Sequence, residues 1–325
     1  MSERLSLPNY GGQAVIEGVM MRGKEAVAIA MRAPNREIVI HHEPLAKIYK
    51  SRLAKMPFFR GLVLLWDALG LGMRALTVSA NIQSGEDEKL EGPQLFFTLA
   101  FALVFGISLF FLTPAALGHL TEKLIHPAPL AATVGEAAAD ASTLEAPGNT
   151  GQSAANAAAW WGNLMEGIVR LFILVGYIAL ISKIPDIRRV FAYHGAEHKT
   201  INAFEAGVEL TPESVSRFSI EHPRCGTAFL LTLVLLSVLV FALLGPLPMQ
   251  WRLLSRILLL PFLAGMSYEY IRWTAKHLKN PLVKLMVKPN LALQHLTTRE
   301  PSLDMLEVSI AAFNAMRERE KEINL

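Results

Sequence analysis

The stretch QLFFTLAFALVFGISLFFLTPAAL, from Gln94 to Leu117, contains no charged residue and is long enough to cross a membrane as a helix. A transmembrane helix needs about 20 mainly apolar residues. A second uncharged stretch, GTAFLLTLVLLSVLVFALLG, runs from Gly226 to Gly245. Of the 325 residues, 52% are hydrophobic and only 18% are charged, which is unusually apolar for a soluble domain. The sequence therefore predicts an integral membrane protein.

Two further apolar segments contain charged residues but are also long enough to cross a membrane. They are Trp160–Ile184, with Glu166 and Arg170, and Leu253–Trp273, with Arg256 and Glu269. The expected fold is therefore a mainly α-helical polytopic membrane protein with about four transmembrane helices.

The distribution of basic residues predicts which side of the membrane each loop faces. Lys and Arg gather at residues 22–55, 183–224 and 272–288, whereas residues 118–159 contain only Lys123. By the positive-inside rule, both termini and the middle basic segment are cytoplasmic, and the Ala-rich segment is external. The Ala-rich segment lacks large apolar residues, so a disordered loop is expected there. The predicted location is the bacterial cytoplasmic (inner) membrane, crossed several times.

The segment Phe58–Ala80 is apolar but contains Asp67 and Arg74. A full crossing there would reverse the side of the preceding chain and break the charge pattern. An interfacial or re-entrant helix is therefore predicted in place of a fifth crossing.

These segments divide the chain into four parts. Met1–Gly12 is too polar for a signal peptide, so an internal span is expected to drive insertion. The parts are a β-rich cytoplasmic element at 1–57, the interfacial or re-entrant helix and loop at 58–92, the transmembrane core at 93–275 with its external loop 119–159 and cytoplasmic helix-loop 185–225, and amphipathic cytoplasmic helices at 276–325.

The N-terminal part is predicted to form a small antiparallel sheet between Gln13 and Pro44. The strings QAVIEGVMMRG, EAVAIAMRA and REIVIHHE alternate apolar and polar residues around turn signals. Gln13 and Glu17 are four apart, so on one strand they would point to the same side and into a site. The alternative, which we favour for Glu17, is a carboxylate that only faces water.

The cytoplasmic loop contains the string YHGAEHK, in which His194, Glu197 and His198 form the pattern H-x-x-E-H. Asp186 and Gly207 are expected to begin and end a helix around it. Residues four apart share one face of a helix, so both imidazoles can hold a divalent metal ion, with zinc expected, and Glu197 can act as general base. The alternative is that the imidazoles only hydrogen-bond to a headgroup or to the backbone.

A zinc site needs a third protein ligand, and three residues are candidates. Glu269 lies near the cytoplasmic end of a predicted span, where an ionisable group usually has a partner or a function. His222 and Cys225 lie in the string EHPRCGT, just before another span. Ordinary roles are open for all three: an ion pair of Glu269 with Arg272, a loop histidine, and a small buried cysteine. Cys225 is the only cysteine, which excludes an intrachain disulfide.

The segment after the last predicted span is amphipathic. Its first part places lysines among apolar residues, which suits a helix lying on anionic lipid. In its last part, apolar residues recur at helical spacing, and this stripe is expected to pack on the protein itself. The stripe consists of Leu303, Leu306, Ile310, Phe313 and Met316.

Four strings together carry a resemblance to a known family. They are GGQAVIEGVMMRG at Gly11–Gly23, YHGAEHKTINAFEAG at Tyr193–Gly207, HPRCGT at His222–Thr227 and LTTREP at Leu296–Pro301. From about residue 11 to the tail, the chain resembles the uncharacterised bacterial integral membrane family typified by YqhQ, commonly labelled a predicted metal-dependent enzyme. The resemblance implies a metal set of His194, Glu197, His198, His222 and Cys225, with Gln13, Glu17 and Glu269 around it.

Two functions from different classes follow from these patterns. The first is a metal-dependent hydrolase that acts from the cytoplasmic face on a lipid-linked or membrane-protein substrate, with Glu197 as the catalytic base. The second is a non-enzymatic scaffold, such as a partner in membrane-protein biogenesis or assembly. The lipid bilayer is a partner in both, and homo-oligomerisation is left open. The net charge of +3, without a nucleic-acid-binding motif, predicts no nucleic-acid partner.

Overall fold

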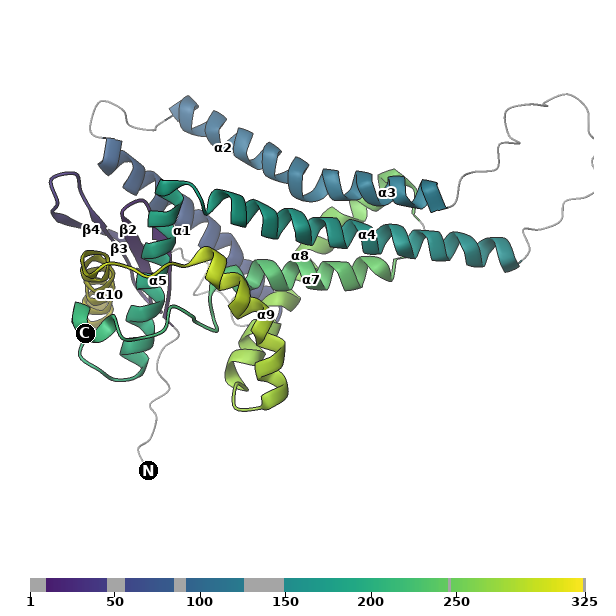
Figure 1. The fold of residues 1–325 in the computed structure, drawn as a ribbon. Helices are drawn as coiled ribbons and strands as arrows, with labels where there is room; N and C mark the ends of the chain where they lie inside the picture. Colours follow the sequence, from purple (N-terminus) through teal and green to yellow (C-terminus); the bar gives the residue numbers. More distant parts are fainter. Residues whose placement is uncertain (1–9, 46–55, 85–91, 126–148, 245–246, 324–325) are drawn as a thin grey trace, which may run out of the picture. The chain divides into compact units, whose positions relative to one another are not determined.

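The computed structural model describes residues 10–45, 56–84, 92–125, 149–244 and 247–323, which are mostly helical with a small N-terminal sheet (Figure 1). The chain divides into two compact units, each built from segments that are distant in sequence. Unit 1 comprises Met1–Thr98, Gly176–Thr232 and Ala264–Leu325, and unit 2 comprises Leu99–Val175 and Leu233–Leu263.

The N-terminal sheet of unit 1 is an antiparallel meander, as the alternating sequence predicts. Its strands are β1 (Gly11–Val15), β2 (Gly18–Arg22), β3 (Val27–Arg32) and β4 (Ile38–Glu43), hydrogen-bonded in chain order. Val15 pairs with Gly18 across a two-residue turn, in which Glu17 has a φ of 52°. Glu17 therefore lies in the turn, and the prediction that it shares a strand with Gln13 is wrong.

Both faces of the sheet are covered, which explains why β2 and β3 are almost entirely apolar. The covering helices are α5 (Pro185–Glu205), α10 (Leu303–Ile323) and α1 (Phe59–Ser84). Val19 and Met21 of β2 pack with α5 and α10, which lie beside the sheet in Figure 1. Met20 points to the other face and packs with Leu71 and Ala75 of α1. A shift of one residue would exchange the two faces, so this burial fixes the strand register.

The apolar stripe of α10 packs on the protein, as predicted. Leu306, Ile310, Phe313 and Met316 are buried in the core that α10 shares with the sheet and α5. Leu303, at the first turn, remains exposed.

Helix α5 has nearly the predicted extent but begins differently. Pro185 is its first residue, and no side chain caps it, because Ile184 occupies the N-cap. Asp186, the predicted cap, lies inside the first turn, where its charge favours the helix dipole. Gly207 follows the helix with a φ of 74°, the left-handed conformation that commonly ends helices.

Two helices of the described chain are long and apolar enough to cross a membrane, Gly92–Leu124 and Trp160–Ile181. The first combines α2 (Gly92–Ile107), the π-helical segment η4 (Ser108–Leu112) and α3 (Thr113–Ile125), and the second is the apolar part of α4 (Asn149–Ile181). The other two predicted spans lie in the shorter apolar helix α7 (Gly226–Ala242) and in α8 (Met249–Lys276), which carries charges near both ends. The structure thus supports membrane association by two helices, and the four-span topology stays a prediction.

Helices occupy both ends of the predicted external loop. Helix α3 continues to Ile125 and α4 begins at Asn149, so the expected loop is shorter than 119–159. Its middle, residues 126–148, lies outside the described residues. Helix α1 is continuous over 26 residues, without the break that a re-entrant segment would need, and an interfacial position for it stays a prediction.

Candidate metal centre

Three side chains from two segments of unit 1 converge: His194 and His198 of α5, and Cys225 just before α7. Each offers one ligand atom, and these atoms lie within 4.8 Å of one another. The two imidazole centroids are 4.4 Å apart, as expected for side chains one helical turn apart. Two imidazoles and a thiolate form a ligand set typical of zinc.

Both histidines are oriented by backbone carbonyls. His194 Nδ1 lies 2.8 Å from the carbonyl oxygen of Thr297, and His198 Nδ1 lies 2.5 Å from that of Ile220. A carbonyl oxygen only accepts, so each Nδ1 carries a hydrogen, and in a neutral ring Nε2 is then the atom with the lone pair. His194 Nε2 lies 3.2 Å from Cys225 Sγ, whereas the buried Nε2 of His198 has no hydrogen-bond partner in the described structure. This is the orientation of metal-binding histidines.

Gly195 allows the segment after helix α9 (Pro281–Thr297) to approach α5 closely. A Cβ at Gly195 would collide with the carbonyl oxygen of Arg299. The Arg299 N–H donates to the carbonyl oxygen of Phe191 at 2.9 Å, which holds this segment along α5. Glycine therefore brings Thr297 within reach of His194, and this contact explains a helix-weakening residue inside the motif.

The loop that precedes Cys225 is fastened to α5 by two side chains. Lys199 is buried, and its Nζ donates to carbonyl oxygens before Ile220; Asn202 Nδ2 donates to carbonyl oxygens on either side of Ile220. The accepting residues are Ser216, Phe218, Ser219 and Glu221. These bonds fix the carbonyl that orients His198.

His222 lies beside the cluster. Its ring centroid is 5.5 Å from that of His198, but it is not one of the three converging ligands. Burial lowers the pKa of His222 well below its ordinary value, and the nearby charge of Arg224 acts in the same direction, so the imidazole is neutral. Gln294 holds its backbone: the His222 N–H donates to Gln294 Oε1 at 2.9 Å, and Gln294 Nε2 donates to the His222 carbonyl at 2.8 Å.

Glu197, the predicted general base, is buried against β1. Its Cγ and Cδ would lie 3.0 Å from a Cβ at Gly12, so this contact depends on glycine. Burial raises the pKa of the Glu197 carboxyl to about 7, while His194 and the Gly12 N–H oppose the rise. Its Oε2 has no hydrogen-bond partner in the part of the chain that the structure describes. Such a carboxyl can hold or release a proton near neutral pH.

Gln13 and Glu17 contact different elements. The Gln13 amide packs directly over Gly72 of α1. Glu17 accepts hydrogen bonds from Arg189 Nε at 2.5 Å and Nη2 at 2.6 Å, and from the Tyr193 hydroxyl at 3.3 Å. Glu17 therefore does more than face water, because it anchors the β1–β2 turn to α5 next to His194.

Glu269 is bound by Arg60 of α1. Arg60 Nε donates to Glu269 Oε1 at 2.6 Å, Arg60 Nη2 donates to Oε2, and the Phe58 N–H adds a third bond at 3.1 Å. Among the described residues, the side chains that converge and could hold a metal ion are His194, His198 and Cys225, and Glu269 is not one of them.

The sequence does not indicate the roles of Thr297, which acts through its backbone carbonyl, and of Gln294, whose side chain holds the His222 backbone. Thr297 lies in the string LTTREP, whose only signal is its resemblance to the family, and nothing in the sequence indicates that its carbonyl oxygen orients His194. Gln294 is fully buried, and a polar residue on the inner face of an amphipathic helix was its only signal.

Comparison with known proteins agrees with the resemblance carried by these strings. The family model described as "Protein of unknown function (DUF1385)" matches residues 56–319. The chain is also 33% identical to "Uncharacterized protein YqhQ" of Bacillus subtilis (strain 168), over 335 aligned positions that cover 97% of this chain and 94% of that protein. No solved structure matches the chain significantly. The chain therefore belongs to the YqhQ-like family of DUF1385 proteins.

Proposed function

We propose that this is a multi-pass protein of the bacterial cytoplasmic membrane that holds a divalent metal ion, zinc by its ligand set, on His194, His198 and Cys225. The observation that carries the proposal is the orientation of the two imidazoles. Both Nδ1 atoms lie at hydrogen-bond distance from carbonyl oxygens, His194 Nε2 lies 3.2 Å from the Cys225 sulfur, and one ligand atom of His198 lies within 4.8 Å of the ligand atoms of the other two residues. His222 is the next nitrogen donor and is available for a fourth position.

The reaction proposed for this centre is hydrolysis of a lipid-linked or membrane-protein substrate from the cytoplasmic face. A bound divalent ion supplies Lewis acidity to a carbonyl or phosphoryl oxygen. Glu197 is the group available to accept and return a proton, because its buried carboxyl shares α5 with both imidazoles and keeps one oxygen unpaired in the described structure. Thr297 and Gln294 are positioning residues, since they act through His194 and the His222 backbone.

The membrane location is supported by the two long apolar helices. No residue of α2 is buried by the protein, so its apolar side chains require an apolar environment such as lipid. The basic residues outside the apolar segments favour cytoplasmic termini.

A non-enzymatic scaffold is the second candidate, and one contact favours it. The 3.2 Å approach of His194 Nε2 to Cys225 Sγ is also a hydrogen-bond distance, so the same residues can brace α5 against the start of α7 without any ion.

Metal content tests the proposed centre directly. Full-length protein purified without chelators should contain about one zinc per chain by mass spectrometry of metals. His198→Ala should lose the zinc, because it removes one of the three proposed ligands. His198 Nε2 has no hydrogen-bond partner in the described structure, so the variant removes no other contact of that atom. His295→Ala, which removes an exposed histidine of α9, is the matched control and should keep the metal. Equal metal in both folded variants, or none in the wild type, would reject the centre.

A second experiment separates hydrolase from scaffold. Cells lacking the protein are complemented with Glu197→Gln, and the purified variant is analysed for metal. A variant that keeps zinc and folds but does not restore the phenotype supports chemistry at Glu197. Full complementation supports the scaffold.

A further inference from the structure

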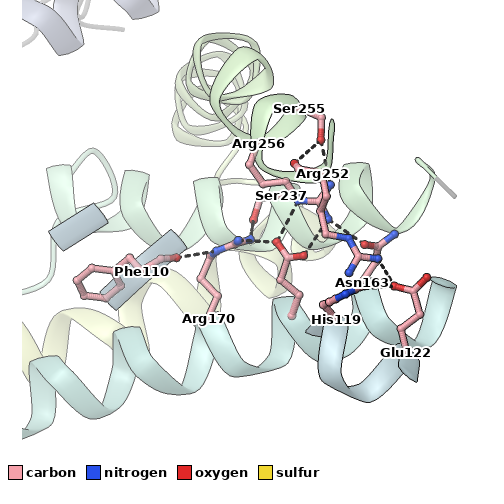
Figure 2. Close-up of polar contacts among 10 residues, drawn as sticks. Phe110, His119, Glu122, Asn163, Arg170, Ser237, Arg252, Ser255 and Arg256 are labelled. Atoms are coloured by element: carbon pink, nitrogen blue, oxygen red, sulfur yellow. Dashed lines mark hydrogen bonds and ion pairs between the residues drawn. The ribbon is translucent and has the colours of Figure 1, made fainter. Parts of the chain in front are cut away.

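A second cluster of buried charges lies in unit 2 (Figure 2). Glu166 of α4 accepts from Arg170 Nη2 at 2.8 Å and from Arg256 Nε and Nη2 at 3.0 and 2.8 Å. All three side chains are almost completely buried. Ionisable groups among apolar helices are costly and usually mark a function.

Each of the three guanidinium nitrogens of Arg170 donates to an acceptor. Besides Glu166, it donates to the Ser237 hydroxyl at 3.2 Å and to the Phe110 carbonyl oxygen at 3.1 Å. Pro114 has no N–H, so it cannot donate to the Phe110 carbonyl four residues earlier, and Arg170 donates in its place. The π-helical segment η4 coincides with this interruption.

Arg252 is different, because most of its donors lack an acceptor. Its Nη2 pairs with Glu122 of α3, but its Nε and Nη1 have no hydrogen-bond partner, although the residue is only 1% exposed. Asn163 Nδ2 and His119 Nδ1 are also buried without a hydrogen-bond partner in the described structure. In Figure 2 these side chains gather around Glu122. The arginine and amide nitrogens can only donate, so the cluster lacks an acceptor.

The net charge of the cluster also indicates that an anion could bind there. The cluster holds three arginines, Arg170, Arg252 and Arg256, against two glutamates, Glu122 and Glu166, which leaves one positive charge in excess. A buried charge without a counter-charge is strongly destabilising. An anion that accepts hydrogen bonds would satisfy both the unpaired donors and the excess charge.

Exposed tryptophans next to this cluster indicate that it lies at the depth of the lipid headgroups. Trp160 and Trp161 precede Asn163 on α4, and Trp251 precedes Arg252 on α8; all three are exposed. Tryptophan is enriched at the headgroup level of membranes. The side chains of His119 and Glu122 are partly exposed, so the cluster reaches the surface on their side. The oxyanion abundant at that level is phosphate.

We propose that Arg252, together with Asn163 and His119, binds a phosphate group at this end of unit 2. A guanidinium recognises phosphate well, because its planar N–H groups make charge-assisted hydrogen bonds to several oxygens. The preference for a lipid phosphate over a soluble one rests on the proposed membrane location. The site is independent of the metal centre.

The test measures ligand-dependent thermal stability of the full-length protein in an uncharged detergent. Three probes are compared: short-chain phosphatidylglycerol, inorganic phosphate, and short-chain diacylglycerol, which has no phosphate. Phosphatidylglycerol should stabilise the wild type, and diacylglycerol should not. Stabilisation by inorganic phosphate as well would identify a soluble phosphate as a ligand of the same site. Failure of both phosphate probes overturns the proposal.

Two variants make the result specific. Arg252→Gln should weaken phosphatidylglycerol binding by about tenfold or more, whereas Lys123→Gln, an exposed charge beside Glu122, should not change it. Glu122→Gln removes a competing carboxylate and should tighten binding, and it covers the case in which Arg252→Gln does not fold. A purely structural ion pair predicts no gain in affinity for Glu122→Gln, and that outcome also overturns the proposal.

Discussion

The histidine cluster of unit 1 and the arginine cluster of unit 2 are both buried, and each contains polar atoms without a partner in the described structure, but these atoms differ in kind. His198 Nε2 and Glu197 Oε2 are electron-pair donors, so they suit a cation. Arg252 Nε and Nη1 carry hydrogens and a positive charge, so they suit an anion. The nature of the unpaired atom therefore indicates the ligand more clearly than burial alone.

The two clusters also differ in what holds them together. The imidazoles of unit 1 are oriented by neutral backbone carbonyls, which depend on the close packing of loops against α5. The side chains of unit 2 are held mainly by one another, through Glu166 and Glu122. Removing a buried charge should therefore destabilise unit 2 most. Small steric changes should disturb the histidine cluster of unit 1.

Arg256→Gln should have the largest effect on stability. It removes the two hydrogen bonds of Arg256 to Glu166 and its contact with the Phe241 ring, 4.3 Å from the ring centroid. Breaking one side of a buried pair costs about 3–5 kcal/mol. Thermal or denaturant unfolding in detergent measures the loss. Arg319→Gln, in an exposed pair with Glu322, is the control and should cost less than about 1 kcal/mol. Similar losses in the two variants would mean that unit 2 does not depend on its buried charges.

Gly195→Ala should have the second-largest effect on stability, and this effect should fall on unit 1. The added Cβ would collide with the Arg299 carbonyl and displace the segment that orients His194, at a cost of about 1–3 kcal/mol. Metal affinity should fall by about 10–100-fold, as expected when a bond that orients a ligand is lost. Gly176→Ala in α4 is the matched control, because, apart from its chain neighbours and the backbone of its own helix, no atom of the described residues lies within 4 Å of the added Cβ. Replacing this helical glycine should be neutral or stabilise by up to about 1 kcal/mol. Equal effects at both positions would contradict the role assigned to Gly195.

Local patterns predicted much of this molecule, because they report burial on one face of an element. Alternation over residues 13–44 gave the sheet, and helical spacing gave the docking of α10. The H-x-x-E-H spacing placed His194 and His198 side by side, and the string HPRCGT supplied Cys225 as the third converging side chain.

The rest could not be predicted, because it depends on segments that meet only in the folded chain. Nothing local to Glu269 indicates that Arg60, more than 200 residues earlier, is its partner. Alternation predicts a continuous strand through Glu17, whereas the left-handed conformation of this residue makes a turn and changes which side chains share a face. In unit 2, the sequence shows Glu166, Arg170 and Arg256 only as charges within two predicted spans, and Arg252, the partner of Glu122, lies just outside the predicted limit of its span.

The smallest effect is expected at Glu17, whose ion pair with Arg189 is the exposed counterpart of Glu166 with Arg256. The Arg189 hydrogen bond lowers the pKa of Glu17 despite partial burial, so the folded value lies below the unfolded one. The pair therefore stabilises the fold above the unfolded pKa, and this contribution is lost as the pH falls through the folded pKa. Arg189 is 53% exposed, so water screens the pair and its contribution should be below about 1 kcal/mol.

Unfolding of the wild type and Glu17→Gln should be compared across pH. The difference in the free energy of unfolding between the two proteins should be constant from pH 7 down to about pH 5. It should shrink below about pH 4, where the carboxyl of the unfolded chain becomes protonated. Arg189→Gln should give the same profile, and the double variant should lose no more than either single variant, since both remove one interaction. A difference that grows on acidification would show that the turn is held to α5 by something other than this charge pair, and the contrast between exposed and buried pairs would no longer explain the two units.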